Sequence, residues 1–129
     1  MAFDFPASYR YADSHEYAWQ DADLIRIGLS AYAVDQLGDI VFVDLPEVGA
    51  ALSRGNSFGT VESVKAVEEM YAPLTGEVLQ RNESLLANPE ELQKDPHGEG
   101  WLLVMRPSDL TQLEQLMDST TYAAKVAAN

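Results

Sequence analysis

Cysteine is absent from the 129-residue sequence, and lysine is scarce, with three residues at positions 65, 94 and 125. Without cysteine there are no disulfides, thiolate nucleophiles or cysteine-based metal sites, so any sulfur redox chemistry has to arrive with a cofactor. Twenty-one acidic residues against eight basic ones give a formal net charge of -13. Such a surface repels phosphate backbones and anionic lipids, which argues against nucleic-acid or membrane partners and favours basic patches on other proteins.

Long hydrophobic runs and targeting segments are also missing. No stretch approaches the roughly 18 consecutive apolar residues needed to span a bilayer. The first six residues have neither the basic-then-apolar layout of a signal peptide nor the arginine-rich layout of a transit peptide. The length suits one compact domain spanning residues 1–129. We therefore expect a cytoplasmic, monomeric protein with a single domain.

The signatures of common catalytic sites are missing as well. The two histidines, His15 and His97, do not have a metal-ligand spacing, and we expect structural roles for them rather than a metal site. No glycine-rich phosphate loop follows a strand, and no Gly-x-Ser-x-Gly elbow occurs. A small hydrolase or lyase is therefore disfavoured, and no catalytic residue is predicted.

The sequence does contain a series of short β-type segments separated by glycine and proline turns. This pattern predicts a mainly β sandwich or barrel with short flanking α-helices. One helix is predicted from Ser30, a good N-cap residue, to Leu37, which precedes Gly38. Two more helix starts, at 107–109 and 118–119, predict C-terminal helices over about 108–128. Strands are predicted over residues 17–27 (with a turn at 20–23), 39–45, 75–81 and 101–106.

Residues 58–71 have the composition of a strand and lack an Asn-Gly or Pro turn signal. Fourteen extended residues would reach roughly 46 Å at about 3.3 Å per residue. A domain of this size has a radius of gyration of only about 14 Å. The segment should therefore fold back near its centre, Val64-Lys65, which places Lys65 at or beside the tip of a hairpin.

Lys65 is isolated among acidic neighbours in this segment. A covalently attached carrier group needs an exposed primary amine on a stiff protrusion and a surrounding shape that a modifying enzyme can recognise. Glu62 and Gly76 are candidates for that recognition, and Gly55 and Gly76 are candidates for the tight turns that fix the protrusion. On spacing alone, the better interpretation of Lys65 is an ordinary solubilising turn lysine.

Several ordered motifs carry a resemblance to a known family over nearly the whole chain. The segment around Lys65 is similar to the lipoylation segment of glycine cleavage system H proteins, and the other motifs follow in the family's order. They are Ser14–Glu16, Gly38–Gly49, Phe58–Ala66, Ala72–Val78, Asn82-Glu83 and Asp95–Trp101. Two departures are Tyr17, where the family usually has Trp, and His97, where Tyr is commoner.

The resemblance implies a lipoyl/biotinyl-type barrel-sandwich hybrid fold and a carrier with no catalytic activity of its own. Lys65 would carry lipoic acid as an amide. The lipoyl group would shuttle an aminomethyl group from glycine decarboxylase (P protein) to the tetrahydrofolate-dependent aminomethyltransferase (T protein), and dihydrolipoamide dehydrogenase (L protein) would reoxidise it. A lipoate-attaching enzyme is a further implied partner. An H-like lipoate donor or relay in lipoyl cofactor biosynthesis is the alternative function, and the sequence hardly separates the two.

Two related carriers fit less well. Biotinyl domains favour methionines beside the lysine, whereas Val64 and Ala66 stand there in this chain. A lipoyl domain of a 2-oxoacid dehydrogenase is disfavoured by the extra N-terminal strands, by the C-terminal helices and by the missing Pro/Ala-rich linker.

The family resemblance also implies a cleft for the loaded arm, which would end in a cationic amine. A carboxylate partner in that cleft would stabilise the amine. Glu16, with Ser14 beside it, matches the family motif that lines such a cleft, and Glu69, just past the hairpin tip, is a second candidate. The alternative for each glutamate is a solvated surface carboxylate.

Overall fold

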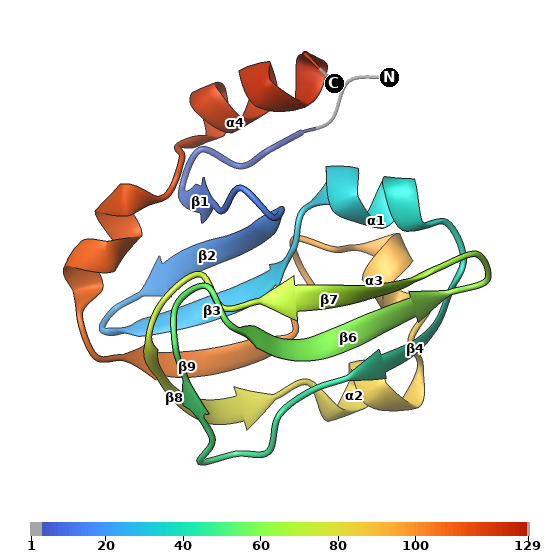
Figure 1. Cartoon of the computed structure of the whole chain (residues 1–129), viewed down its shortest axis with the longest axis horizontal. Coiled ribbons are helices and arrows are strands. Elements are labelled where there is room, and N and C mark those ends of the chain that lie inside the picture. The colour runs from blue at the N-terminus through green and yellow to red at the C-terminus, as the bar shows by residue number, and fades with distance from the viewer. Residues whose placement is uncertain (1–3, 129) are drawn as a thin grey trace.

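The computed structural model describes residues 4–128, and over this range the chain forms nine strands in two antiparallel sheets (Figure 1). The larger sheet has the strand order β1-β2-β3-β9-β8-β5, and the smaller sheet has the order β4-β6-β7. The prediction of a mainly β protein is confirmed. The strands are β1 Tyr9–Tyr11, β2 Glu16–Asp21, β3 Leu24–Leu29, β4 Ile40–Asp44, β5 Ala51–Leu52, β6 Ser57–Ser63, β7 Val67–Tyr71, β8 Gly76–Arg81 and β9 Leu103–Pro107.

Alternate residues of the larger sheet face the core. Ile25 and Ile27 of β3 lie opposite Met105 and Leu103 of β9, and Met105 lies opposite Val78 of β8. All five side chains are fully buried. Because successive side chains of a strand point to opposite faces, this register turns one face of the sheet inward along three neighbouring strands.

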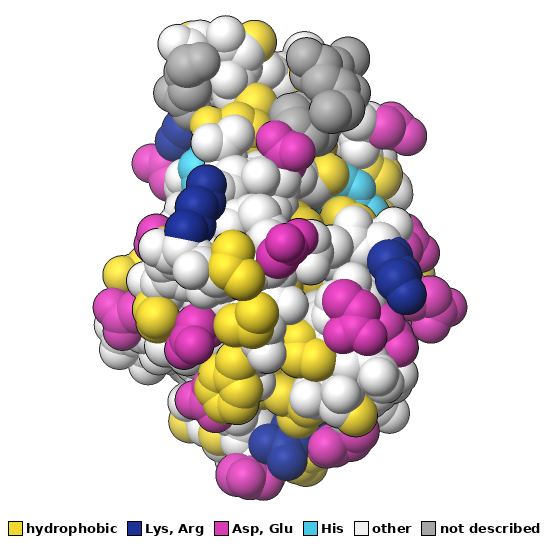
Figure 2. Space-filling model, turned by 90° about the vertical axis from the view of Figure 1, so that its right-hand side faces the viewer, with side chains coloured by type: hydrophobic (Ala, Val, Ile, Leu, Met, Phe, Trp, Pro, Cys, Tyr) yellow, Lys and Arg dark blue, Asp and Glu magenta, His cyan; other side chains and the backbone are white. Residues whose placement is uncertain are grey.

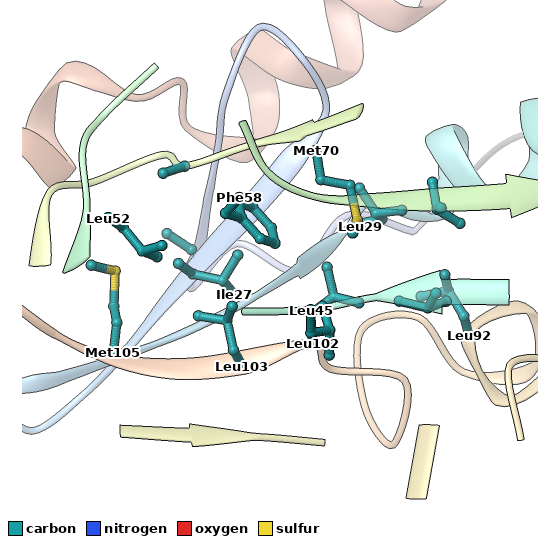
Figure 3. Packing of buried hydrophobic residues seen from close by; sticks show 14 of the residues in the cluster. Ile27, Leu29, Leu45, Leu52, Phe58, Met70, Leu92, Leu102, Leu103 and Met105 are labelled. Carbon is teal, nitrogen blue, oxygen red and sulfur yellow. The ribbon is translucent and has the colours of Figure 1, made fainter. Parts of the chain in front are cut away.

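The smaller sheet covers that inward face. Figure 3 shows Phe58 of β6 and Met70 of β7 pointing toward Ile27 and Leu29 of the larger sheet. Each fully buried side chain of this size contributes roughly 1.5–3 kcal/mol through removal from water. The base of the β6–β7 hairpin is therefore anchored in the main core, while its tip extends beyond it (Figure 1).

Five short helical segments flank the sheets: α1 Ala31–Leu37, α2 Glu83–Ala87, α3 Glu91–Lys94, the 3-10 helix η1 Leu110–Gln115, and α4 Ser119–Ala127. The side chains of Ser30, Asn82 and Asp118 accept hydrogen bonds from first-turn backbone N–H groups and so cap α1, α2 and α4. Gly38 follows α1 with a φ of 79°, a conformation that suits glycine. The predicted first helix and the predicted C-terminal helices are confirmed, although the first C-terminal one is a 3-10 helix.

A second, aromatic cluster fastens α4 to the edge of the larger sheet. Tyr122 and Val126 of α4 pack against Tyr9, Tyr11 and Tyr17. The rings of Tyr11 and Tyr122 are stacked, with centroids 4.5 Å apart and planes 6° from parallel. Offset aromatic pairs of this kind add to the stability that burial itself provides. The C-terminal helix is thus held beside β1, as Figure 1 shows.

Two strands were not predicted, and both depend on partners. β1 spans three residues within a polar segment and exists because it pairs with β2, Tyr9 lying opposite Trp19. β5 spans two residues and pairs with β8. Pieces this short carry no periodicity of their own, so only the neighbouring strand reveals them.

Candidate functional site

The β6–β7 hairpin turns through Val64, Lys65 and Ala66, which confirms the predicted reversal. Ser63 organises this turn: its Oγ accepts hydrogen bonds from the backbone N–H groups of Lys65 (3.3 Å) and Ala66 (3.1 Å). The Ser63 N–H donates to the Ala66 carbonyl (2.8 Å), and the Val64 N–H donates to the carbonyl of Asp39 (3.0 Å), just before β4. The backbone of the tip is therefore fixed by local bonds and tied to the neighbouring strand.

Lys65 is exposed at this tip, and within residues 4–128 the structure gives its ammonium group no hydrogen bond or ion pair. Lys125 on α4 differs, because its Nζ lies 2.5 Å from a carboxylate oxygen of Asp13. An amine without such a partner can be approached and acylated. Lys65 thus has the exposure and the rigid support that a covalent attachment site requires.

Exposed apolar side chains surround the tip. Val64 and Val67 flank Lys65 with 70% and 62% of their surface exposed, and Val41 and Phe42 lie on the adjacent edge strand β4. Figure 2, which looks at the end of the molecule where the hairpin tip lies, shows a band of hydrophobic side chains with acidic side chains on either side. We call Val41, Phe42, Val64 and Val67 the tip patch. Together with its acidic border, it offers another protein an apolar contact and a charge pattern.

A cleft of about 470 Å³ begins beside Lys65. It lies between the hairpin, α1 and the turn before β2. Its lining combines apolar side chains with several carboxyl and hydroxyl groups. The lining residues are Ser14, His15, Glu16, Leu29, Tyr32, Ala33, Gln36, Leu37, Val61, Lys65, Ala66, Glu68, Glu69 and Met70.

Glu16 is the buried acid of this cleft, with 1% of its surface exposed. Its Oε2 accepts a hydrogen bond from the Tyr71 N–H (2.9 Å), and its Oε1 accepts one from the Ser14 hydroxyl. Burial raises the pKa of the Glu16 carboxyl to about 7, although both hydrogen bonds act in the opposite direction. A cation that entered the cleft would favour the ionised carboxylate and gain a charge-assisted partner.

Glu69 also lines the cleft, but it is exposed. Its carboxylate accepts a hydrogen bond from the Tyr71 hydroxyl (3.3 Å) and raises the pKa of that phenol. The structure therefore places Ser14, Glu16 and Glu69 in the lining of one cleft with Lys65, and of these only Glu16 is buried. Their role toward a bound arm stays a prediction.

The other predicted residues lie outside this cleft. Glu62 is exposed on β6 opposite Val67, close to the tip, and its recognition by a modifying enzyme stays a prediction. Gly55 adopts a φ of 87° in the turn before β6, as a tight turn requires. The turn role for Gly76 is wrong: this residue begins β8, where a side chain would collide with the backbone of Arg106 in β9.

Sequence reasoning missed His15, Tyr71 and Ser63 as contributors to the site. Ser63 carried a usable signal, since a serine whose hydroxyl can accept backbone N–H groups favours a turn. Tyr71 contributes its backbone N–H to Glu16, which is 55 residues away, and no local pattern reveals such a pairing. His15 has a φ of 80°, uncommon for a residue with a side chain.

The histidines are engaged within the protein. His97 Nε2 accepts a hydrogen bond from the Ala31 N–H at the start of α1 (3.2 Å), and burial lowers the pKa of this imidazole. Across residues 4–128, no group of three or more His, Asp or Glu side chains is arranged to hold a metal ion. In the same range, every helix is too short or too polar to cross a bilayer.

Comparison with known proteins identifies the family. The family model described as "Glycine cleavage H-protein" matches residues 9–129. The glycine cleavage system H protein of Synechococcus sp. (strain WH7803) is 84% identical over 128 residues, which cover 99% of each chain. That of Prochlorococcus marinus (strain NATL2A) is 66% identical and covers 99% of this chain and 100% of its own length.

A solved structure agrees with these sequences. The crystal structure of a glycine cleavage system H protein from Mycobacterium marinum superposes with a TM-score of 0.88 at 35% identity, covering 95% of this chain and 99% of the other. The predicted barrel-sandwich fold is confirmed by this likeness. The chain therefore belongs to the glycine cleavage H-protein family, the lipoyl carriers of the glycine cleavage system.

Proposed function

We propose that Lys65 is the residue of this chain that carries lipoate, as an amide on its Nζ. The observation that carries the proposal is an unpaired, exposed amine on a hydrogen-bonded hairpin tip. The cleft beside it supports the fit, because its apolar lining from Leu29, Leu37 and Met70 suits an aliphatic arm. A lipoyl group attached to Lys65 would supply a disulfide for the uptake and transfer of the aminomethyl group.

The chain's own residues hold and shield the arm. The hydrogen bonds of Ser63 fix the turn, so Lys65 stays beside the mouth of the cleft. Glu16, buried and oriented by the Ser14 hydroxyl and the Tyr71 N–H, offers a carboxylate to a cationic arm end. Glu69 adds a second, exposed carboxylate to the lining of the cleft.

The proposed partners are glycine decarboxylase, the aminomethyltransferase, dihydrolipoamide dehydrogenase and a lipoate-attaching enzyme, all acting on Lys65 or the group that it bears. The tip patch and the acidic side chains around it support this proposal, since each partner has to reach the tip. The carrier itself contributes no catalytic step. The lipoate-relay function stays an alternative prediction.

Intact-mass analysis tests the attachment site. Wild-type protein from lipoate-replete cells should carry a lipoyl adduct, and Lys65→Arg should carry none. Lys94→Arg is the matched control, because Lys94 is also exposed but ends the short helix α3. A Lys65→Arg protein that keeps the adduct, or a wild type that is never modified, would overturn the proposal.

A further inference from the structure

We propose that Tyr122 of α4 is a positioning residue of the arm cleft, because its hydroxyl holds His15 as the neutral imidazole protonated on Nε2 and joins both walls of the cleft. The inference rests on the proposed use of this cleft by the lipoyl arm. It assigns a role to the C-terminal helix, which lies outside the cleft lining.

The Tyr122 hydroxyl lies between two polar side chains. Its oxygen is 2.7 Å from His15 Nδ1 and 2.6 Å from Ser30 Oγ. Tyr122 and Ser30 are fully buried, so water does not compete for these bonds. His15 lines the cleft next to Glu16, and Ser30 caps α1. One phenol therefore connects the residue beside the buried acid with the helix that forms the opposite wall.

The two walls are also joined directly. The Ser30 N–H donates to the His15 carbonyl (2.9 Å), and the Ser30 Oγ accepts from the Ala33 N–H (3.2 Å). The helix that begins here supplies Tyr32, Ala33, Gln36 and Leu37 to the cleft. Moving the Tyr122 hydroxyl would therefore disturb His15, in the turn before β2, and Ser30, the N-cap of α1.

The direction of the hydrogen bonds follows from where each proton can go. Ser30 Oγ already accepts from Ala33, and within the described residues the only acceptor for its own proton is the Tyr122 oxygen. The Tyr122 proton is then donated to His15 Nδ1. His15 must accordingly carry its proton on Nε2. In the reversed chain, the buried Ser30 hydroxyl would lose its acceptor, which is costly.

The same chain disfavours a charged His15. Protonation of Nδ1 would turn that nitrogen into a donor, and either the Ser30 or the Tyr122 hydroxyl would then lose its acceptor. Burial lowers the pKa of His15, Lys125 on α4 acts in the same direction, and Asp13 opposes them. Glu16 follows His15 in the chain, and the Tyr32 ring lies 5.1 Å from the imidazole. A neutral His15 leaves the cleft beside Glu16 without a positive charge that would repel a cationic arm end.

The stacked tyrosine pair provides a matched experiment. Tyr122→Phe removes the hydroxyl that contacts His15 and Ser30. Tyr11→Phe removes a hydroxyl from the other ring of the same buried stack, where it donates to the Pro6 carbonyl (3.2 Å). Both variants keep the ring and its packing, so they differ in the bond that the hydroxyl made.

Imidazole nitrogen NMR of the full-length, unlipoylated protein reads the result directly. The wild type should show His15 protonated on Nε2, and His97, whose Nε2 accepts from Ala31, protonated on Nδ1. Tyr122→Phe should give His15 a mixture of tautomers and a pKa closer to the ordinary value while His97 stays unchanged. Tyr11→Phe should leave both histidines as in the wild type.

A wild-type His15 protonated on Nδ1, or a His15 unaffected by Tyr122→Phe, would overturn the proposal. The wild-type spectrum decides this even if the variant fails to fold. The measurement uses protein without the arm, so it does not depend on which lysine is lipoylated. In lipoylated protein, Tyr122→Phe should also expose the arm's disulfide to a small thiol reductant at least severalfold more than Tyr11→Phe does.

Discussion

At the scale of single residues, Glu16 combines burial with a carboxyl group that has no positive partner in the described structure. Two hydrogen bonds satisfy its oxygens, yet its pKa rises to about 7 because the charged form is poorly solvated. A buried carboxyl group with a raised pKa and no positive partner is suited to binding a cationic ligand. A carboxylate already paired with a lysine or arginine would have its pKa lowered instead.

The raised pKa predicts a pH-dependent stability. Between the ordinary pKa of 4.5 and about 7, folded Glu16 binds more protons than unfolded Glu16, so the free energy of unfolding falls as the pH rises. The contribution lost across this window is about 3 kcal/mol. Denaturant unfolding of the wild type and of Glu16→Gln, measured from pH 4.5 to 8, should show a shallower decline in the variant.

Glu69→Gln is the control, since Glu69 is exposed in the same cleft. Its profile should run parallel to that of the wild type. Equal slopes for the wild type and Glu16→Gln would show that Glu16 titrates normally in the folded protein.

The sequence pointed to Lys65 and Glu16 but could not show how they are held. Lys65 was placed by the length of its segment and by the motif around it. The burial of Glu16 was not predictable, because the residue stands at the start of a strand between polar and aromatic neighbours. Its partner, the N–H of Tyr71, arrives from the far end of the hairpin, and such a pairing is set by sheet packing alone.

At the scale of elements, one serine, Ser63, organises the turn of the β6–β7 hairpin. Ser63→Ala would leave the N–H groups of Lys65 and Ala66 without their acceptor, which should cost about 1 kcal/mol of stability. Hydrogen exchange at these two amides should accelerate more than elsewhere in β6 and β7. Amide-resolved hydrogen exchange by NMR measures the local effect, and denaturant unfolding measures the change in the free energy of unfolding.

Ser57→Ala provides the comparison, because Ser57 is exposed at the opposite end of β6. It should leave the tip amides unaffected. If the Lys65 and Ala66 amides exchange equally in both variants, Ser63 does not hold the turn.

Elements with their own boundary signals could be predicted, and dependent ones could not. Ser30 and Gly38 mark the two ends of α1 through cap chemistry that a sequence displays. The hairpin was predicted because residues 58–71, if fully extended, would be longer than the domain. β1 lacked such a signal, because it forms only against β2. Gly76 was wrongly assigned to a turn. A glycine that permits close strand packing cannot be distinguished in the sequence from one that permits a turn.

At the scale of the whole molecule, a net charge of -13 acts on every encounter with a partner. Attraction to basic patches should raise association rates at low salt and fade as the Debye length shrinks from about 30 Å at 0.01 M to about 3 Å at 1 M. We expect the second-order rate of lipoate attachment to fall roughly 10-fold or more over this range.

Two neutralising variants locate the effect. Glu68→Gln, which removes a charge from the cleft lining beside Lys65, should reduce the rate and its salt dependence. Glu114→Gln removes an exposed charge in η1, outside that lining, and should change both less. Identical behaviour of the two variants would mean that total charge matters and its placement does not.

The face of the larger sheet that points away from the core carries a groove over β2, β3, β8 and β9, and this groove has a practical consequence. Trp19 and Trp101, the two tryptophans of the chain, both line it with Arg26, and none of its lining residues belongs to the cleft beside Lys65. Intrinsic tryptophan fluorescence should therefore report the integrity of the larger sheet. It should not change when an arm enters or leaves the cleft. An optical signal for that movement has to be introduced on the cleft itself, and the absence of cysteine leaves a single engineered thiol there free for selective labelling.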